Sequence, residues 1–414
     1  MTLYHKNRIF DVKIRRKRFM KRIVDLFAGC GGMSLGFQNA GFDVVGAFEY
    51  WKPAADCYAQ NFNHPVFKTD LSNVGAAIGE IRALKPDIII GGPPCQDFSH
   101  AGKRIEDERA GLTEAFAEIV AQINPQWFVM ENVDRAQKSS AYAVARAMLK
   151  NAGYGLTETV LDASLCGIPQ KRKRFFCIGS LSQGDDYLLD YIDGRLNKKE
   201  TTIRDYFGST LDFEYYYRHP RNYSRRAVYS IDEPAPTIRG VNRPVPKGYP
   251  GHPGDACPIN ASIRAMTTLE RSLIQTFPAD FKWIGNKTDM EQMIGNAVPV
   301  KLAEFVAEAL IHHIGKNEEQ AHATADYGGF YEWLCGIQKL SEKVKRDTVS
   351  RLKRANAIRG LPQQPDSYYL FLLEQSNEYK ALTPTVRSQV KRAVNLYSVF
   401  CGDTNQLSLF DMEA

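Results

Sequence analysis

Short apolar runs alternate with amphipathic stretches between residues 21 and 180. Because the runs are too short for buried helices, they predict strands. The predicted strands are residues 22–27, 43–48, 87–90, 127–130, 158–162 and 174–178. A helix is expected after the first of them, ending near residue 40. Strands that alternate with helices indicate an α/β fold with a doubly wound, mostly parallel sheet. Ligands bind such sheets beyond the carboxyl ends of the strands, so the residues that follow the strands are the first candidates for a site.

The pattern changes after residue 180. Residues 181–260 are rich in Tyr, Arg, Pro and Gly and show no clear period, which predicts a loop-rich region. Helices are expected near residues 268–275 and 300–313. The last hundred residues are predicted to be helical, with basic segments at 342–359 and 385–397.

Composition excludes several classes of protein. With 44% hydrophobic and 24% charged residues, the 414-residue chain has the balance of a globular protein. No apolar run approaches the roughly 18 residues of a membrane helix, and no apolar segment follows the basic N-terminus as in a signal peptide. The eight cysteines form no CxxC or zinc-site spacing. We therefore expect no metal and no membrane segment, and free thiols in a reducing cytoplasm.

The net charge of +6 is concentrated at the N-terminus. Residues 1–22 hold nine Lys or Arg against one acid, so the rest of the chain is slightly acidic. Such an arm is able to follow a phosphate backbone. The alternative, which we favour, is a loosely ordered extension of residues 1–19 before a usual start at Met20.

Candidate chemistry follows the predicted strands. The turn Ala28-Gly29-Cys30-Gly31-Gly32 presents free backbone amides at a helix start, and Glu49 ends the second strand. Without a following Lys-Ser/Thr pair, the turn is not a phosphate-binding P-loop. Taken alone, it is equally typical of a tight strand–helix connection.

A cysteine and an acid occupy two later strand ends. Cys95 follows Gly91-Gly92-Pro93-Pro94, which predicts a rigid loop presenting an exposed nucleophile rather than a buried thiol. Glu131 follows the strand at 127–130, where it is placed to act as a general acid or merely as a helix cap. The four cations of residues 170–174 fit phosphate binding, although a solvated sheet edge is more common.

In this order and spacing, the blocks resemble those of the bacterial DNA cytosine-5 methyltransferase family. The matching blocks are Asp25 to Gly32, Glu49, Asp70, Gly92-Pro93-Pro94-Cys95, Glu131-Asn132-Val133, Gln170 to Arg174 and Gly295-Asn296-Ala297-Val298-Pro299. The resemblance covers most of residues 22–315. It implies the class I S-adenosylmethionine-dependent methyltransferase fold.

By this resemblance the cofactor is S-adenosylmethionine. Phe27 would lie against the adenine, Glu49 would bind the ribose hydroxyls and Asp70 the adenine amino group. The expected cofactor-binding residues are Asp25, Phe27, Gly29, Gly31, Glu49, Asp70, Pro93, Asn296 and Val298.

The implied catalytic residues are Cys95, Glu131, Arg172 and Arg174. The Cys95 thiolate would add to carbon 6 of cytosine, and Glu131 would assist protonation of ring nitrogen 3. Arg174, and more loosely Arg172, would hold the base oxygen and nearby phosphates. Because stacked cytosine hides carbon 6, the base must be flipped out of the duplex.

The same resemblance implies a division into domains. We expect the basic extension at 1–19, a catalytic and cofactor-binding domain at 20–180, and a target-recognition domain with hinge at 181–290. A returning segment would follow at 291–316 and a helical C-terminal extension at 317–414. The recognition region is short for the family, and Leu269 stands where the family often has Arg. The expected DNA-binding residues are Ser99, Lys103, Arg104, Gln170, Tyr217, Arg218 and Arg239.

The C-terminal tail carries a second, weaker resemblance. Gln406-Leu407-Ser408-Leu409-Phe410 is similar to the pentapeptide with which bacterial proteins dock onto the replication sliding clamp. The expected partner-binding residues are Gln406, Leu407, Leu409 and Phe410. With a C-terminal peptide of this kind, the protein would have two partners, double-stranded DNA and the sliding clamp.

Three functions from different classes remain open from sequence. The first is a DNA methyltransferase, orphan or paired with a restriction enzyme, that acts as a monomer on cytoplasmic, nucleoid DNA. The second is a tRNA cytosine-5 methyltransferase on the same fold. The third is a non-catalytic DNA-binding scaffold, against which the presence of Cys95 and Glu131 argues.

Overall fold

The computed structural model describes residues 21–94, 106–181, 183–222, 224–322, 325–337, 340–362, 365 and 367–402. The chain forms two compact units, Met1–Ile311 and His312–Ala414. Each unit has its own buried apolar core, so each is described by itself.

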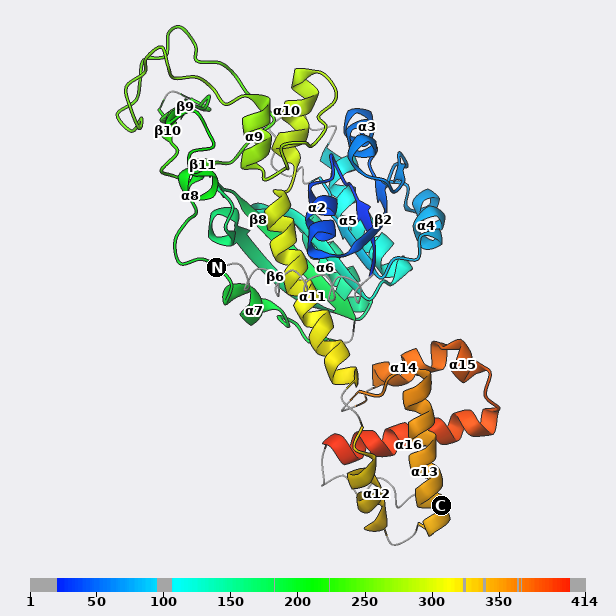
Figure 1. Ribbon diagram of the computed structural model, residues 1–414. Coiled ribbons are helices and arrows are strands. Elements are labelled where there is room, and N and C mark those ends of the chain that lie inside the picture. Colours follow the sequence, from blue (N-terminus) through cyan, green and yellow to red (C-terminus); the bar gives the residue numbers. More distant parts are fainter. Residues whose placement is uncertain are drawn as a thin grey trace. The chain divides into compact units, whose positions relative to one another are not determined.

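A seven-stranded sheet organises the first unit, with the strand order β3-β2-β1-β4-β5-β8-β6 (Figure 1). The strands are β1 Arg22–Leu26, β2 Asp43–Phe48, β3 Val66–Phe67, β4 Ile88–Gly91, β5 Trp127–Val133, β6 Tyr154–Asp162 and β8 Lys173–Leu181. The first five are parallel, whereas β8 runs antiparallel to both β5 and β6. The predicted doubly wound, mostly parallel sheet is thereby confirmed.

Helices cover both faces of the sheet. On one face, α4 (Val74–Ala83), α5 (Glu106–Ile123) and α6 (Ser140–Asn151) pack onto alternate residues of the strands. In β4, for example, Ile89 belongs to this core, and the alternation of a strand sends Ile88 and Ile90 to the other face. The helices α2 (Gly32–Ala40) and α11 (Val300–His322) lie against each other so closely that a Cβ at Gly36 would approach that of Ala303 to 2.5 Å.

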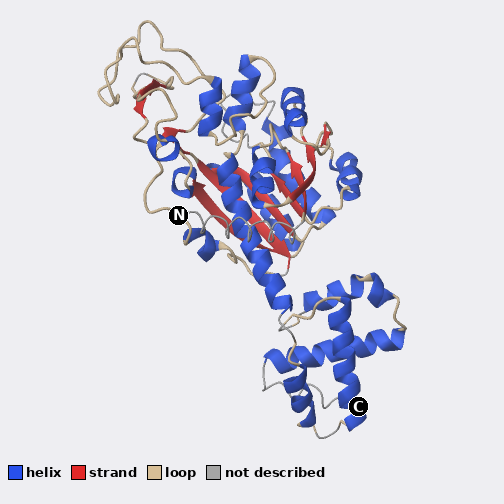
Figure 2. Cartoon of the chain, viewed as in Figure 1, coloured by secondary structure: helices blue, strands red, loops and turns tan. Residues whose placement is uncertain are grey.

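Shorter elements connect the sheet to the rest of the unit. They are α3 Lys52–Asn61, η1 Asp134–Lys138, η2 Ala163–Cys166, β7 Gln170–Lys171, α7 Leu189–Asp193 and α8 Ile203–Phe207. Beyond α8 the chain is mostly loop, as predicted from its composition (Figure 2). The elements of this region are β9 Tyr215–Tyr217, β10 Val228–Ser230, β11 Ala235–Pro236, α9 Thr268–Ile274 and α10 Lys287–Asn296.

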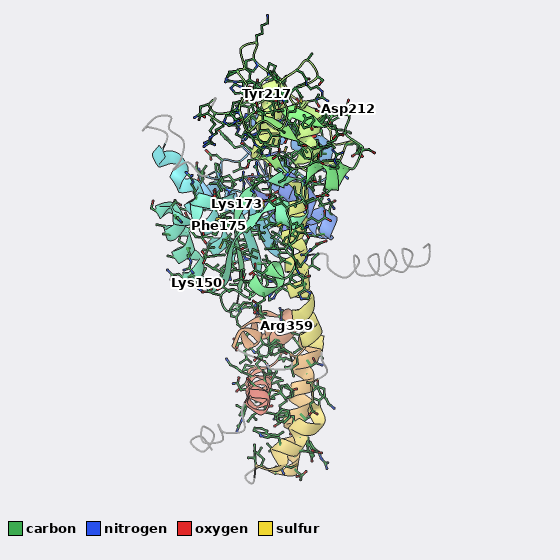
Figure 3. All side chains as sticks on the ribbon, turned by 90° about the vertical axis from the view of Figure 1, so that its left-hand side faces the viewer. Lys150, Lys173, Phe175, Asp212, Tyr217 and Arg359 are labelled. Carbon is green, nitrogen blue, oxygen red and sulfur yellow. The ribbon has the colours of Figure 1, made fainter. Side chains whose placement is uncertain are left out.

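The loop-rich region is attached to the sheet unit by backbone pairing and by a small core. β11 pairs in parallel with β7, immediately before β8 of the main sheet. Tyr216, Ile231, Ile238 and Ile294 belong to one buried cluster, so α10 shares its packing with the loops. In Figure 3, Tyr217 lies in the loop-rich region, and Lys173 and Phe175 mark β8.

The second unit is helical, as predicted. It contains α12 Tyr327–Cys335, α13 Glu342–Ile358, α14 Ser367–Gln375, α15 Asn377–Lys380 and α16 Pro384–Gly402. Phe330, Leu352 and Tyr397 are buried in its core. Within the described part of the chain, no helix combines the length and apolarity needed to cross a membrane.

Candidate active site at the carboxyl ends of the strands

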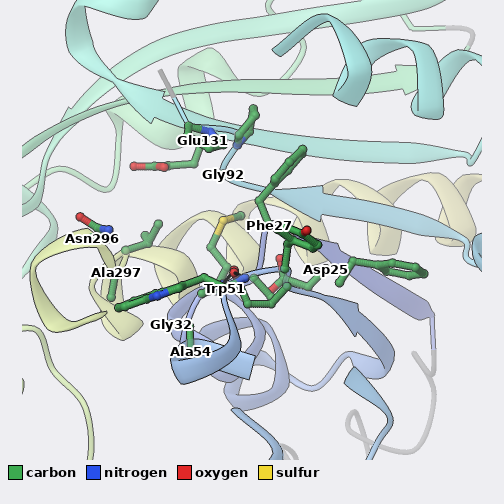
Figure 4. A pocket seen from close by; sticks show the side chains of 18 of the residues that line it. Asp25, Phe27, Gly32, Trp51, Ala54, Gly92, Glu131, Asn296 and Ala297 are labelled. Atoms are coloured by element: carbon green, nitrogen blue, oxygen red, sulfur yellow. Dashed lines mark hydrogen bonds between the residues drawn. The ribbon is translucent and has the colours of Figure 1, made fainter. Parts of the chain in front are cut away.

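A pocket of about 750 Å³ opens where the strand order of the sheet reverses. β2 and β3 lie on one side of β1, whereas β4 and β5 lie on the other, so the connections leave a crevice beyond the carboxyl ends of β1 and β4. Side chains from distant parts of the sequence line it (Figure 4). Among the predicted residues, the lining includes Asp25, Phe27, Gly29, Glu49, Asp70, Pro93, Glu131, Arg174, Asn296 and Val298.

The turn after β1 has an unusual backbone. Phe27 has φ 57°, the left-handed region that side chains with a Cβ rarely adopt. Gly31, which caps α2, has φ 97°. A Cβ at the next residue, Gly32, would lie 2.3 Å from the Val298 carbonyl oxygen. The turn therefore fits closely against the segment that returns from α10, and only a residue without a side chain fits at position 32.

Asp25 is a buried carboxylate at the base of the pocket. Its Oδ2 accepts a hydrogen bond from Ser34 Oγ at 2.6 Å, and that hydroxyl is in turn 2.7 Å from Tyr58 Oη. Tyr58 Oη lies 2.6 Å from His64 Nε2. Burial raises the pKa of Asp25 to about 7, while the Ser34 hydrogen bond opposes this rise. Asp25 Oδ1 has no hydrogen-bond partner among the described residues, so it is free to accept a ligand's proton donor.

Glu49 fixes the entrance of the pocket. Its two carboxylate oxygens accept hydrogen bonds from the backbone amides of Gly29 and Trp51, each at 2.7 Å. Burial raises the pKa of Glu49, and these two bonds oppose that rise. Each oxygen retains a further lone pair, so Glu49 is able to accept two hydroxyl donors as well.

Glu131 and Arg174 form the polar side of the pocket. Arg174 Nε lies 2.8 Å from Glu131 Oε1, and both side chains are largely buried. Burial raises the pKa of Glu131, whereas the charges of Arg174 and Arg172 act to lower it. A Cβ at Gly92 would lie 3.1 Å from Glu131 Oε2, so the strand end before Pro93 passes close to this carboxyl. A buried carboxyl poised in this way is suited to exchange a proton with a bound base.

The predicted nucleophile lies outside the described residues, together with Ser99, Lys103 and Arg104. The structure does describe the chain up to Pro94, which lines the pocket and directly precedes Cys95. Asn132 Nδ2 donates a hydrogen bond to the Pro93 carbonyl at 3.0 Å. That bond links the end of β5 to the segment leading to Cys95.

Gln170 and Arg172 have partners inside the protein. Both are buried, with 0% and 1% of their surface exposed. Gln170 bonds to Gln275 and to the Ile238 amide. The Arg172 guanidinium donates to the carbonyls of Ile238, Gly295 and Ala297. The structure therefore shows an internal role for these two residues, and their contact with DNA or the base stays a prediction.

Of the other predicted DNA-binding residues that the structure describes, one is buried and two are partly exposed. Tyr217 is 1% exposed and its hydroxyl lies 3.2 Å from His219 Nδ1, so its predicted DNA contact stays a prediction. Arg218 and Arg239 are partly exposed beside a second, small pocket, and they donate to the carbonyls of Thr237 and His219. These two arginines remain candidates for DNA contact.

Sequence reasoning missed several residues of the pocket. Trp51 lines it two residues after Glu49, and Ser34 and Tyr58 extend the hydrogen-bond chain from Asp25. Trp51 carried a usable signal, since it lies three residues after the end of β2, between that strand and α3. Within the described residues, no group of three or more His, Cys, Asp or Glu side chains is arranged to hold a metal ion.

The chain is similar to known proteins in family pattern, in sequence and in fold. The profile of C-5 cytosine-specific DNA methylases matches residues 21–312. Type II methyltransferase M.HgiDI of Herpetosiphon aurantiacus is 54% identical over 300 residues, which are 72% of this chain and 97% of that protein. M.HindV of Haemophilus influenzae is 54% identical over 293 residues, covering 70% and 96%. The crystal structure of S. pombe Dnmt2 methyltransferase has a TM-score of 0.54 at 20% identity, covering 72% and 99%, and supports the fold.

Proposed function

The chain belongs to the C-5 cytosine-specific DNA methylase family, and we propose that the pocket described above is its active site. The protein is a DNA (cytosine-5) methyltransferase that uses S-adenosylmethionine. We further propose that it methylates a defined short sequence of duplex DNA as the modification enzyme of a Type II restriction–modification system. The names of the relatives from Herpetosiphon and Haemophilus support this role.

The pocket residues fit the cofactor. S-adenosylmethionine supplies an electrophilic methyl group when it is bound. Asp25 Oδ1, buried and without a partner among the described residues, would accept from the ammonium group. Glu49 would accept from the ribose hydroxyls, and the rings of Phe27 and Trp51 offer apolar surface for the adenine. Asp70, Asn296 and Val298 also line the pocket and would complete the enclosure.

The protein's part in the chemistry follows from the residues around the flipped base. The Cys95 thiolate would form a bond to carbon 6 of cytosine, and the ring electrons would shift toward ring nitrogen 3. Glu131, paired with Arg174, would hold a proton at that nitrogen and so prevent negative charge from building up. Carbon 5 thereby becomes nucleophilic. After methylation, loss of the carbon 5 proton and β-elimination would release Cys95.

The observation that carries this proposal is the convergence of Glu131, Arg174 and the segment before Cys95 on one pocket with Asp25 and Glu49. The test is base-resolution methylation sequencing of DNA from a methylation-free bacterium that expresses the protein. We expect methylated cytosines in one short motif, and none with the Cys95→Ala variant as control. Folded protein that leaves DNA unmethylated would contradict the proposal and favour the tRNA alternative.

Two finer expectations concern partners and location. We propose that Gln406, Leu407, Leu409 and Phe410, which lie outside the described residues, bind the replication sliding clamp. Deletion of residues 405–414 should abolish clamp pull-down but preserve methylation of free DNA, and unchanged pull-down would contradict the assignment. We also propose that the enzyme acts as a monomer on nucleoid DNA in the cytoplasm, which light scattering and cell fractionation would test.

A further inference from the structure

The second unit lies beyond the part of the chain that the family shares. The family profile ends at residue 312, and the relative M.HgiDI is covered over 97% of its length by 72% of this chain. The unit nevertheless has a complete core of its own, built on Phe330, Leu352 and Tyr397. The second unit is therefore a separately packed addition to the enzyme, and its surface is available to bind a further ligand.

The basic residues of this unit are concentrated on one helix. Residues 312–414 contain thirteen Lys or Arg and twelve Asp or Glu, so the unit as a whole is close to neutral. Nearly half of these cations lie in α13, which has six basic and only two acidic residues. Such an excess on one helix generates a positive potential at its exposed face.

The six cations of α13 fall into two classes. Lys345 pairs with Glu342 at 2.9 Å, and Arg351 lies 3.7 Å from Asp347. Both acidic residues of the helix are therefore already paired with a cation. The other four are exposed, and none of them forms an ion pair within the described residues. These four, called here the α13 stripe, are Lys343, Arg346, Lys353 and Arg354.

Helix geometry gathers the α13 stripe on one face. At 3.6 residues per turn the four side chains fall within an arc of roughly 100°, opposite the buried Thr348, Leu352 and Ala355. Lys353 also lies 5.3 Å from the centre of the Tyr327 ring. A solvated helix usually alternates acids and bases four residues apart, but Lys353 and Arg354 have no acid one turn before or after them.

We propose that the α13 stripe binds the phosphate backbone of duplex DNA without reading its sequence, as a second DNA contact of the enzyme. The stripe is about 17 Å long, because eleven residues separate its ends at 1.5 Å each. At about one phosphate charge per 1.7 Å of duplex, this length faces roughly five base pairs. The proposal rests on DNA being the substrate, and it adds a role for the unit that the relatives lack.

A tethered phosphate contact has a clear physical consequence. It holds the enzyme on DNA of any sequence, which raises the local concentration of target sites for the catalytic unit. It makes no base contact, so it leaves the choice of cytosine unchanged. The stripe should therefore change the binding of non-target DNA and the KM for DNA, but not kcat.

The experiment measures fluorescence anisotropy of a labelled 40-base-pair duplex lacking target motifs, with the full-length protein at several salt concentrations. The test variant combines Lys343→Gln, Arg346→Gln, Lys353→Gln and Arg354→Gln. The matched control removes the same charge elsewhere with Arg82→Gln, Lys85→Gln, Lys150→Gln and Lys391→Gln. Thermal unfolding checks that both variants are folded.

We expect the test variant to lose roughly three to four in the slope of log K against log salt, at about 0.9 per phosphate contact. Its affinity at low salt should fall about tenfold or more, while the control keeps the wild-type slope. Equal slopes for all three folded proteins would overturn the proposal. Competition by polyglutamate or by anionic vesicles as effective as that by duplex would also overturn it, in favour of an acidic protein or a membrane. Because binding is measured without methyl transfer, failure of the proposed methylation would be seen separately.

Discussion

Replacing Arg172 by Met tests whether this residue stabilises the protein or contacts the base. The guanidinium is buried and donates to the Ile238 and Gly295 carbonyls at 2.9 Å and to the Ala297 carbonyl at 3.0 Å. Methionine fills a similar volume but donates nothing, so three carbonyl oxygens would be left without their present donor. Hydrogen bonds to a charged group contribute about 1.5–3 kcal/mol each.

The net loss is smaller than the sum of the three bonds. Burying a guanidinium carries a desolvation cost of several kcal/mol that Met avoids. We therefore expect Arg172→Met to lower the free energy of unfolding by about 2–4 kcal/mol. For a unit of this size, Met1–Ile311, each kcal/mol lowers the melting temperature by roughly 1.5 °C. Differential scanning calorimetry of the purified variant measures this shift directly.

Arg174→Met is the matched comparison, two residues further along the chain in β8. Its side chain faces the pocket and pairs with Glu131, so its loss leaves one carboxyl that is able to take up a proton instead of remaining charged. We expect this variant to melt within about 2 °C of wild type and to lose methyl transfer. If Arg172→Met melted like wild type but failed to bind or methylate DNA, the internal role of Arg172 would be refuted.

Three further predictions concern the pocket and its supports. Because the pKa of Asp25 is 3.8 unfolded and about 7 folded, the native state binds more protons between these values, and its stability falls as pH rises through them. Asp25→Asn should remove up to about 4 kcal/mol of this pH dependence, measured by urea unfolding. It should also weaken S-adenosylmethionine binding in calorimetric titration. An unchanged pH profile of stability would refute the raised pKa of Asp25. Glu291→Gln should lower the free energy of unfolding by about 3–5 kcal/mol, because it leaves Arg271 buried without its ion-pair partner. Urea unfolding measures this loss. The control is the Glu291→Leu/Arg271→Leu double variant, which should lose less stability. Gly32→Ala should weaken cofactor binding, because its Cβ would meet the Val298 carbonyl oxygen at 2.3 Å; wild-type affinity would show that the returning segment adapts.

Six of the seven strands of the main sheet, and the strand-end residues Glu49 and Glu131, could be predicted because they follow from local pattern and topology, whereas the two-residue β3 (Val66–Phe67) was missed. β2 begins and ends where the apolar run does, at Asp43 and Phe48. In a parallel sheet all carboxyl ends share one edge, so Glu49 and Glu131 had to lie at the same edge of the sheet. The convergence of Asn296 and Val298 was not deducible from local pattern. It depends on α10 and on the close approach to Gly32, and only the family resemblance indicated it.

The burial of Gln170 and Arg172 has a physical reason that the sequence did contain. The family resemblance indicated contacts with DNA and the base, but strand alternation divides residues 170–174 between two faces. Lys171 and Lys173 are exposed, whereas Gln170 and Arg172 point inward. Applying the period of two to residues 170–174 would have predicted the inward pair. It would not have predicted their partners, which lie more than sixty residues away: the Ile238 and Gly295 carbonyls for Arg172, and the Gln275 side chain and the Ile238 amide for Gln170.

These two inward residues connect the loop-rich region to the cofactor pocket. Arg172 bonds to Ile238, just after β11, and also to Gly295 and Ala297, which line the pocket. Gln170 accepts from the Ile238 amide and donates to Gln275, whose side chain donates to the Ala297 carbonyl at 3.0 Å. These bonds connect the loops after β11 to the segment that carries Asn296 and Val298. Arg172 and Gln170 position the two halves of the site relative to each other, which explains why they are polar although neither reaches the surface.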